Sequence, residues 1–189
     1  MEQKKVKSMG SVIIVPESEV DSSLDDGIKK LLTLCFGWTP EFQERSYWHL
    51  KPETRLIYRD NQGGMLGHIS IISKTTKVGS EEVKIAGAGA FAVHPEFRNS
   101  GIGKELVNEM IKHARQQGYD LIVGFAKDPA SIHICVKSGA IPTKDLFVVK
   151  YPDGGEVLKP HTLVWPLSEK KYKMILDLNY STNLGYGSW

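Results

Sequence analysis

The residues with the clearest chemical potential are an arginine and two glycines within the run Val93-His94-Pro95-Glu96-Phe97-Arg98-Asn99-Ser100-Gly101-Ile102-Gly103-Lys104. An apolar strand is expected to end at Pro95, and an amphipathic helix is expected to begin at about Gly101. Glycines at a helix start let the backbone approach a ligand closely and leave N–H groups exposed, while the helix dipole adds positive charge. The pattern therefore predicts an anion site suited to a diphosphate, with Arg98 and Lys104 adding charge.

Two other phosphate-binding patterns do not explain these residues. The string GxxxxGK[ST] occurs nowhere in the chain. The string Gly87-Ala88-Gly89-Ala90-Phe91-Ala92 fits GxGxxA, but a dinucleotide fingerprint needs a helix to start at its glycines. Strand residues and Pro95 follow instead, so the diphosphate is predicted to bind at residues 98–104 and not at residues 87–92.

The pattern Val-x-Pro-x-x-Arg-x-x-Gly-x-Gly, from Val93 to Gly103, resembles the acetyl-CoA signature of the GNAT N-acetyltransferase superfamily. The resemblance implies acetyl-CoA as cosubstrate and no metal. It also implies that pantetheine pairs beside the strand ending at Val93, where a backbone N–H polarises the acyl carbonyl. Many relatives dimerise, so a homodimer is possible. The implied cofactor-binding residues are Phe91, Ala92, Val93, Arg98, Asn99, Ser100, Gly101, Ile102, Gly103 and Lys104.

The acid and the base of such a reaction are less well defined. An amine with a pKa of about 10.4 needs roughly 4 kcal/mol to become neutral at physiological pH, so a base assists its attack on a thioester. Relatives often place a glutamate on the strand before the signature, but residues 87–90 contain none. His68 is the predicted base, because its unperturbed pKa near 6.5 leaves it mostly neutral. A hydrogen-bonded structural histidine is the alternative.

The usual acid of the superfamily is a tyrosine, and the resemblance puts Cys135 at its position. A thiol could protonate the leaving thiolate, although a buried small apolar residue is the alternative interpretation. The small residues 87–90 leave two further hypotheses open, either tight packing or a slot for acyl groups longer than acetyl.

Two subgroups suggest the acceptor. The segment from Arg45-Ser46 through residues 52–55 to Lys77-Val78-Gly79 resembles nodulation-factor N-acyltransferases, and His68 with Trp189 resembles aminoglycoside 2′-N-acetyltransferases. Both imply an amine on a sugar. Aromatic faces stack on sugars and acids attract amines, whereas a small aromatic core and a disordered tail are the alternatives. The predicted substrate-binding residues are Trp38, Glu41, Tyr47, Trp48 and Trp189.

The sequence leaves two other functions open. The same chemistry would serve a protein or peptide N-acetyltransferase, or a polyamine N-acetyltransferase. A coenzyme A-binding module without catalysis is the third hypothesis, because the usual glutamate and tyrosine are missing. Positioning and a neutral amine supply most of what thioester aminolysis needs, so an enzyme is the favoured prediction.

The elements that must position these residues follow from periodicity and turn signals. Their order, β-α-(α)-β-β-β-α-β-α-β-β, predicts an α/β (α+β) fold with a GNAT-like, mostly antiparallel central sheet flanked by helices. The expected strands are Val12–Val15, Thr54–Arg59, Met65–Ser73, Val83–His94, Leu121–Phe125, Leu146–Tyr151 and Thr162–Trp165. Helices are expected over about 24–35, 101–114 and 132–136, with Gly118 capping the second.

Composition bounds the remaining possibilities. The chain has 189 residues, so residues 1–189 are expected to form one acyltransferase domain, with 1–10 and about 168–189 as terminal extensions. The lysines of residues 170–173 are expected to lie in solvent. A net charge of +2 gives no sign of nucleic acid as a partner, and two cysteines make neither a disulfide framework nor a zinc site. No targeting segment or membrane-length apolar run occurs, so a cytoplasmic protein is expected.

Overall fold

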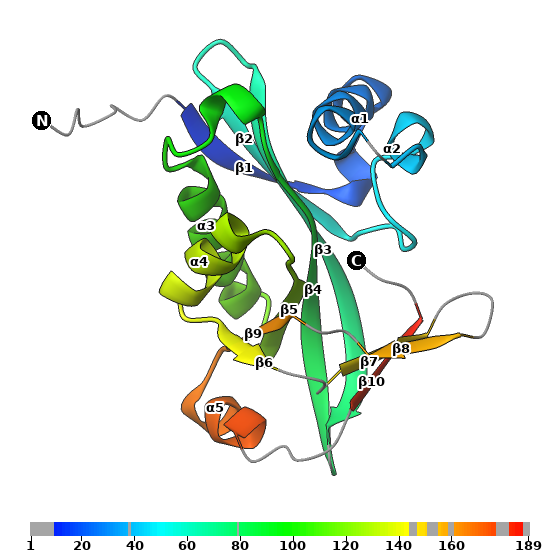
Figure 1. Cartoon of the computed structure of the whole chain (residues 1–189), viewed down its shortest axis with the longest axis vertical. Coiled ribbons are helices and arrows are strands. Elements are labelled where there is room, and N and C mark those ends of the chain that lie inside the picture. The colour runs from blue at the N-terminus through cyan, green and yellow to red at the C-terminus, as the bar shows by residue number, and fades with distance from the viewer. Residues whose placement is uncertain are drawn as a thin grey trace, which may run out of the picture.

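The computed structural model describes residues 10–37, 39–78, 80–143, 147–150, 155–158, 161–176 and 182–186 (Figure 1). The strands are β1 (Gly10–Pro16), β2 (Thr54–Asp60), β3 (Met65–Val78), β4 (Glu81–Val93), β5 (Leu121–Phe125), β6 (Ile141–Thr143), β7 (Phe147–Lys150), β8 (Glu156–Leu158), β9 (Thr162–Pro166) and β10 (Thr182–Tyr186). The helices are α1 (Ser22–Phe36), α2 (Glu41–Glu44), α3 (Ile102–Gln116), α4 (Pro129–Lys137) and α5 (Glu169–Leu176), with short 3-10 helices η1 (Glu17–Glu19) and η2 (Pro95–Phe97).

The central sheet has seven strands in the order β1-β2-β3-β4-β5-β9-β6. Only β4 and β5 pair in parallel, and the other neighbours pair antiparallel. A second sheet has the order β10-β7-β8. The predicted α/β fold with a mixed, mostly antiparallel sheet flanked by helices is therefore confirmed. Among the described residues, no helix is long and apolar enough to cross a membrane.

Helices cover both faces of the central sheet (Figure 1). One face packs against α3, whose apolar side chains recur every three or four residues and enter the core with strand residues such as Ile71 and Ile122. The other face packs against α1 and α2 at one end of the sheet, where Ile28 and Phe42 contact the side chains of Ile57 and its neighbours. Gly118, with φ +69°, follows α3 as predicted.

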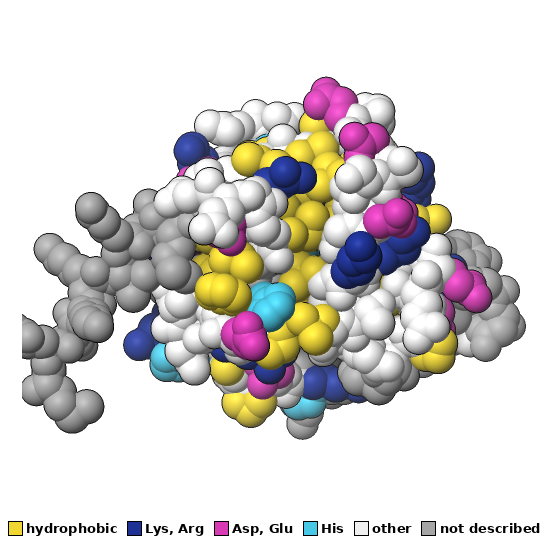
Figure 2. Space-filling view, turned by 90° about the horizontal axis from the view of Figure 1, so that it is seen from above, with side chains coloured by type: hydrophobic (Ala, Val, Ile, Leu, Met, Phe, Trp, Pro, Cys, Tyr) yellow, Lys and Arg dark blue, Asp and Glu magenta, His cyan; other side chains and the backbone are white. Residues whose placement is uncertain are grey.

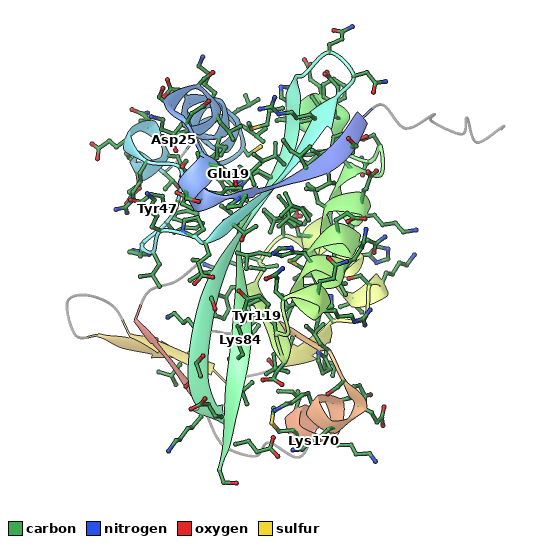
Figure 3. All side chains as sticks on the ribbon, turned by 180° about the vertical axis from the view of Figure 1, so that it is seen from behind. Glu19, Asp25, Tyr47, Lys84, Tyr119 and Lys170 are labelled. Carbon is green, nitrogen blue, oxygen red and sulfur yellow. The ribbon has the colours of Figure 1, made fainter. Side chains whose placement is uncertain are left out.

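The C-terminal region differs from the prediction of a solvated lysine run. The side chain of Lys171 is buried, and its Nζ lies 3.1 Å from Glu81 Oε2 and 3.5 Å from Asp120 Oδ1. Lys170 does lie in solvent, where its Nζ is 2.8 Å from Glu81 Oε1 (Figure 3). Ile175 of α5 joins the core beside β4, β5 and β9. Acidic residues from distant parts of the chain therefore bury one lysine of the run, and no local pattern reveals them.

We predict opposite effects for two glycine-to-alanine changes. In β3, a Cβ at Gly67 would lie 2.7 Å from Leu106 Cδ1, so Gly67→Ala forces this buried side chain of α3 to shift and destabilises the protein by roughly 1–3 kcal/mol. In α1, a Cβ at Gly27 would meet only the flexible end of Met65, so Gly27→Ala stabilises the helix by about 0.5–1 kcal/mol. Urea unfolding of both variants measures the difference. Equal stabilities for the two variants would contradict this account of α3 packing.

Candidate active site

Strand β4 separates from β5 before either strand ends. The two pair in register from Ile85–Leu121 to Ala88–Gly124, and no described residue pairs with β4 on that side beyond Ala88. A strand edge that leaves its neighbour presents unpaired N–H and C=O groups, which need water or a ligand as partners. The structure therefore contains an open strand edge over residues 89–93, which includes the stretch Phe91–Val93 that is predicted to bind pantetheine.

A β-bulge lies at the point of separation. In the β3–β4 pairing, His68 faces Ala92 and Ser70 faces Gly89. Two residues of β4, Ala90 and Phe91, therefore stand opposite one residue of β3, and Ala90 has φ +47°. A bulge bends its strand and increases the local twist, which accounts for the departure of β4 from β5.

The loop after β4 leaves the start of α3 open. Asn99 has φ +63° and Gly101 has φ +97°, and Gly101 is the N-cap residue of α3 with no side-chain cap. The first N–H groups of a helix have no partner within the helix, so they are available to an anion. Figure 2 looks down on this end of the molecule, where basic side chains flank a band of hydrophobic ones.

The residues predicted to bind the cofactor lie at one place. A Cβ on Gly103 would come 3.3 Å from Phe91 Cζ, so the start of α3 lies directly against the open part of β4. The exposed Arg98 turns back, and its Nε donates a 3.4 Å hydrogen bond to the Val93 carbonyl. Lys104 is exposed in the first turn of α3. The tertiary structure thus joins the predicted strand edge and the predicted anion loop into one surface.

His68 is fully buried in β3, with both ring nitrogens engaged. Its Nδ1 lies 3.0 Å from the Ala90 carbonyl oxygen, and its Nε2 lies 3.4 Å from Arg55 Nη1. A carbonyl only accepts and a guanidinium only donates, so these partners assign the proton to Nδ1 and leave the ring neutral. Burial, with the nearby Arg55 charge, lowers the pKa of His68 to about 3. The catalytic role stays a prediction, and these surroundings favour a role in holding the bulge.

Arg55 is a second buried polar residue on this face, and sequence analysis missed it. Its Nε donates to Glu17 Oε2 at 2.7 Å, its Nη1 to the Ser46 carbonyl at 2.6 Å and its Nη2 to Ser46 Oγ at 3.0 Å. The Ser46 hydroxyl in turn donates to Asp25 of α1. One guanidinium therefore connects η1, the segment after α2 and the histidine beside the bulge. An arginine two residues before the core residue Ile57 was the available sequence signal.

Cys135 lies in the core between α4 and the sheet, and burial raises the pKa of its thiol to about 11. A coenzyme A-type thiol has a pKa of about 8.5, so proton transfer from Cys135 to the leaving thiolate is uphill by about 3 kcal/mol. These surroundings favour the packing interpretation, and the role as an acid stays a prediction.

The predicted substrate-binding residues lie in different surroundings. Trp48 packs in an aromatic cluster, with its ring centroid 4.4 Å from that of Phe42. Tyr47 is half-buried, and the Arg55 guanidinium lies 6.0 Å from its ring centroid. Glu41 is exposed at the start of α2. Trp38 and Trp189 lie outside the described residues. Within the described parts of the chain, no three His, Cys, Asp or Glu side chains are grouped to hold a metal ion.

The fold and this site agree with a known enzyme class. The model of the Acetyltransferase (GNAT) family matches residues 26–139, which is more than half of the chain. The chain therefore belongs to the GNAT acetyltransferase family, as the signature from Val93 to Gly103 predicted. Comparison with curated protein sequences found no match.

Solved structures share the fold at low sequence identity. The GNAT N-acetyltransferase YhbS from Escherichia coli in complex with CoA has a TM-score of 0.63 and 18% identity, covering 96% of this chain and 93% of that chain. A GNAT acetyltransferase from Brucella melitensis in complex with acetyl-CoA has a TM-score of 0.56 and 15% identity, covering 92% and 94%. The NatC complex bound to Gag peptide and CoA matches with a TM-score of 0.55 and 18% identity, covering 84% and 99%.

We predict that His68 makes stability depend on pH. Its pKa is about 3 when folded and 6.5 when exposed, so between these values the unfolded state binds more protons and stability falls as the pH falls. From pH 7 to pH 5 this group costs about 2 kcal/mol, a loss that His68→Asn removes. Urea unfolding of both proteins at the two pH values measures it. Parallel pH dependences would show that His68 titrates normally.

Proposed function

We propose that the protein transfers the acetyl group of acetyl-CoA to a primary amine of a small amino sugar. The observation that carries the proposal is the open edge of β4 over residues 89–93, directly beside the uncapped start of α3. An extended pantetheine chain can pair with such an edge, and a diphosphate can accept hydrogen bonds from the helix N–H groups. The residues present therefore fit acetyl-CoA.

The reaction is a direct transfer. The lone pair of a neutral amine attacks the thioester carbonyl, so a C–N bond forms and the C–S bond breaks. The amine loses one proton and the departing thiolate gains one, which leaves the amide and free coenzyme A. We assign both proton transfers to water, because His68 and Cys135 are buried and their pKa values of about 3 and 11 disfavour them as base and acid. Orientation of the two reactants on the fold supplies the main rate advantage.

The acceptor class rests on the two subgroup resemblances and on the side chains after α1. Tyr47 is half-buried beside Arg55 and Arg45, and Glu41 is exposed on the neighbouring α2. An aromatic ring such as Tyr47 can stack on a sugar ring, and a carboxylate such as Glu41 attracts the ammonium group of an amino sugar. Peptide and polyamine amines remain the alternatives, together with coenzyme A binding without catalysis.

We predict turnover with amino sugars. Release of coenzyme A thiol from acetyl-CoA is measured against aminoglycosides, glucosamine oligomers, polyamines and N-terminal peptides, with calorimetric binding of acetyl-CoA alongside. Thiol release confined to the amino sugars is the expected result. Turnover confined to peptides or polyamines would show that the proposed acceptor class is wrong. Binding of acetyl-CoA without any turnover would favour the non-catalytic module. Longer acyl-CoAs in the same assay test whether the small residues 87–90 admit longer chains.

We predict that Gly101→Val abolishes acetyl-CoA binding. The valine side chain would stand at the start of α3, where the diphosphate is proposed to approach the backbone. Gly118→Val is the matched control, because Gly118 lies at the other end of α3, also has positive φ and also has no atom within 4 Å of its added Cβ. Both variants carry similar backbone strain, so calorimetry isolates the effect on the ligand. Equal affinities in both variants would refute this site.

A further inference from the structure

We propose that His68 and Arg55 are positioning residues that aim the N–H of Phe91 at the acyl carbonyl of the cosubstrate. The inference rests on the proposed function, because it requires acetyl-CoA to lie along the open edge of β4. It concerns neither the acid nor the base of the reaction. It assigns to two buried side chains the task of holding one peptide group in place.

The peptide group between Ala90 and Phe91 follows a residue that is held in an unfavourable conformation. Ala90 has φ +47°, a region that alanine rarely adopts because its Cβ crowds the backbone. Such a conformation persists only where the surrounding structure holds it. One described contact at this residue is the hydrogen bond from His68 Nδ1 to the Ala90 carbonyl, 3.0 Å long and buried. A bond of this kind is stronger in the low-dielectric interior than in water.

The direction of this bond fixes the direction of the next N–H. The C=O of Ala90 and the N–H of Phe91 belong to one planar trans peptide, in which they point opposite ways. In the sheet, β3 with His68 lies on one side of β4 and β5 lies on the other. A carbonyl turned toward the side chain of a β3 residue turns the Phe91 N–H away from β3, and on our proposal this N–H faces the side that β5 has left. That side is the open edge at which the thioester is proposed to bind.

Arg55 determines which ring nitrogen of His68 carries the proton. Its Nη1 faces His68 Nε2, so Nε2 has to accept and Nδ1 has to carry the proton that the Ala90 carbonyl receives. The guanidinium is itself held by Glu17 and by the carbonyl and hydroxyl of Ser46. Since Ser46 immediately precedes Tyr47, the same group that orients His68 also fixes the segment assigned to the acceptor. The Arg55 guanidinium thus contacts both the histidine beside the proposed thioester site and the segment assigned to the acceptor.

Two substitutions separate the two contacts of His68. The amide nitrogen of an asparagine can take the place of Nδ1, so His68→Asn keeps a donor for the Ala90 carbonyl. The longer side chain of glutamine places its amide nearer to the position of Nε2, so His68→Gln keeps the Arg55 contact and loses the bond to the bulge. A general loss of core packing would affect both variants, whereas loss of positioning affects His68→Gln alone.

The experiment reads the carbonyl directly and needs no acceptor. Acetyl-CoA carrying carbon-13 at the thioester carbonyl is bound to each protein, and isotope-edited infrared spectroscopy records the carbonyl stretch. A hydrogen bond from Phe91 N–H lowers this frequency relative to the free thioester. We expect the full shift in the wild-type protein and in His68→Asn, and loss of most of it in His68→Gln. Calorimetry with coenzyme A, which lacks the carbonyl, should give unchanged affinity in all three.

The outcomes distinguish this inference from the proposed function. No binding of acetyl-CoA to the wild-type protein overturns the proposed function and the carbonyl contact with it. Binding with a full frequency shift in folded His68→Gln overturns the positioning role alone. If the variants do not fold, nitrogen-15 NMR of the wild-type side chain decides: the Nδ1–H tautomer between pH 5 and pH 8 supports the inference. An Nε2–H tautomer or a charged ring would overturn it.

Discussion

Strand β4 has to satisfy two requirements that conflict. It pairs with β3 along almost its whole length, yet it must leave β5 early enough to expose an edge. Buried backbone groups are almost always hydrogen-bonded, so a strand leaves its neighbour only where the geometry forces it to and where another partner can take over. The bulge at Ala90 provides that geometry. The position of the anion loop, the helix α3 behind it and the proposed path of the thioester all depend on it.

The polar groups beneath the bulge explain why it does not relax. Arg55 has no exposed surface, and its guanidinium donates to Glu17 and twice to Ser46. Removing one member of such a buried pair costs about 3–5 kcal/mol, because the remaining charge loses its partner in a medium that cannot solvate it. This is a stiff arrangement by comparison with a loop of exposed residues. It suits a site in which a single N–H must keep its direction.

The proposed diphosphate-binding loop, residues 98–104, depends on backbone N–H groups and not on buried side chains. The helix dipole contributes only about 0.3–2 kcal/mol, so binding of a diphosphate there depends on several backbone N–H groups acting together. The diphosphate must therefore come close to the backbone, and the helix must come close to the strand. Glycines permit both. Gly101 allows the positive φ at the helix start, while the missing side chain of Gly103 lets α3 lie against Phe91. Gly67 plays the same part further along the helix.

The binding loop at residues 93–103 could be predicted from the sequence alone. A proline, an arginine and two glycines at fixed spacing encode a local strand–loop–helix. The apolar stripe of α3 and the unbroken apolar run at residues 121–125 were predictable for the same reason, since both are patterns of neighbouring residues. The positive φ of Ala90 and the ion pairs of Lys171 left no such local signal, and the only local sign that Arg55 is buried was its place two residues before Ile57. The Ala90 and Arg55 features exist because β2, β3, β4 and η1 meet in space, and the Lys171 ion pairs exist because α5 meets β4 and the residue before β5. A contact between distant segments appears only once the tertiary structure brings them together.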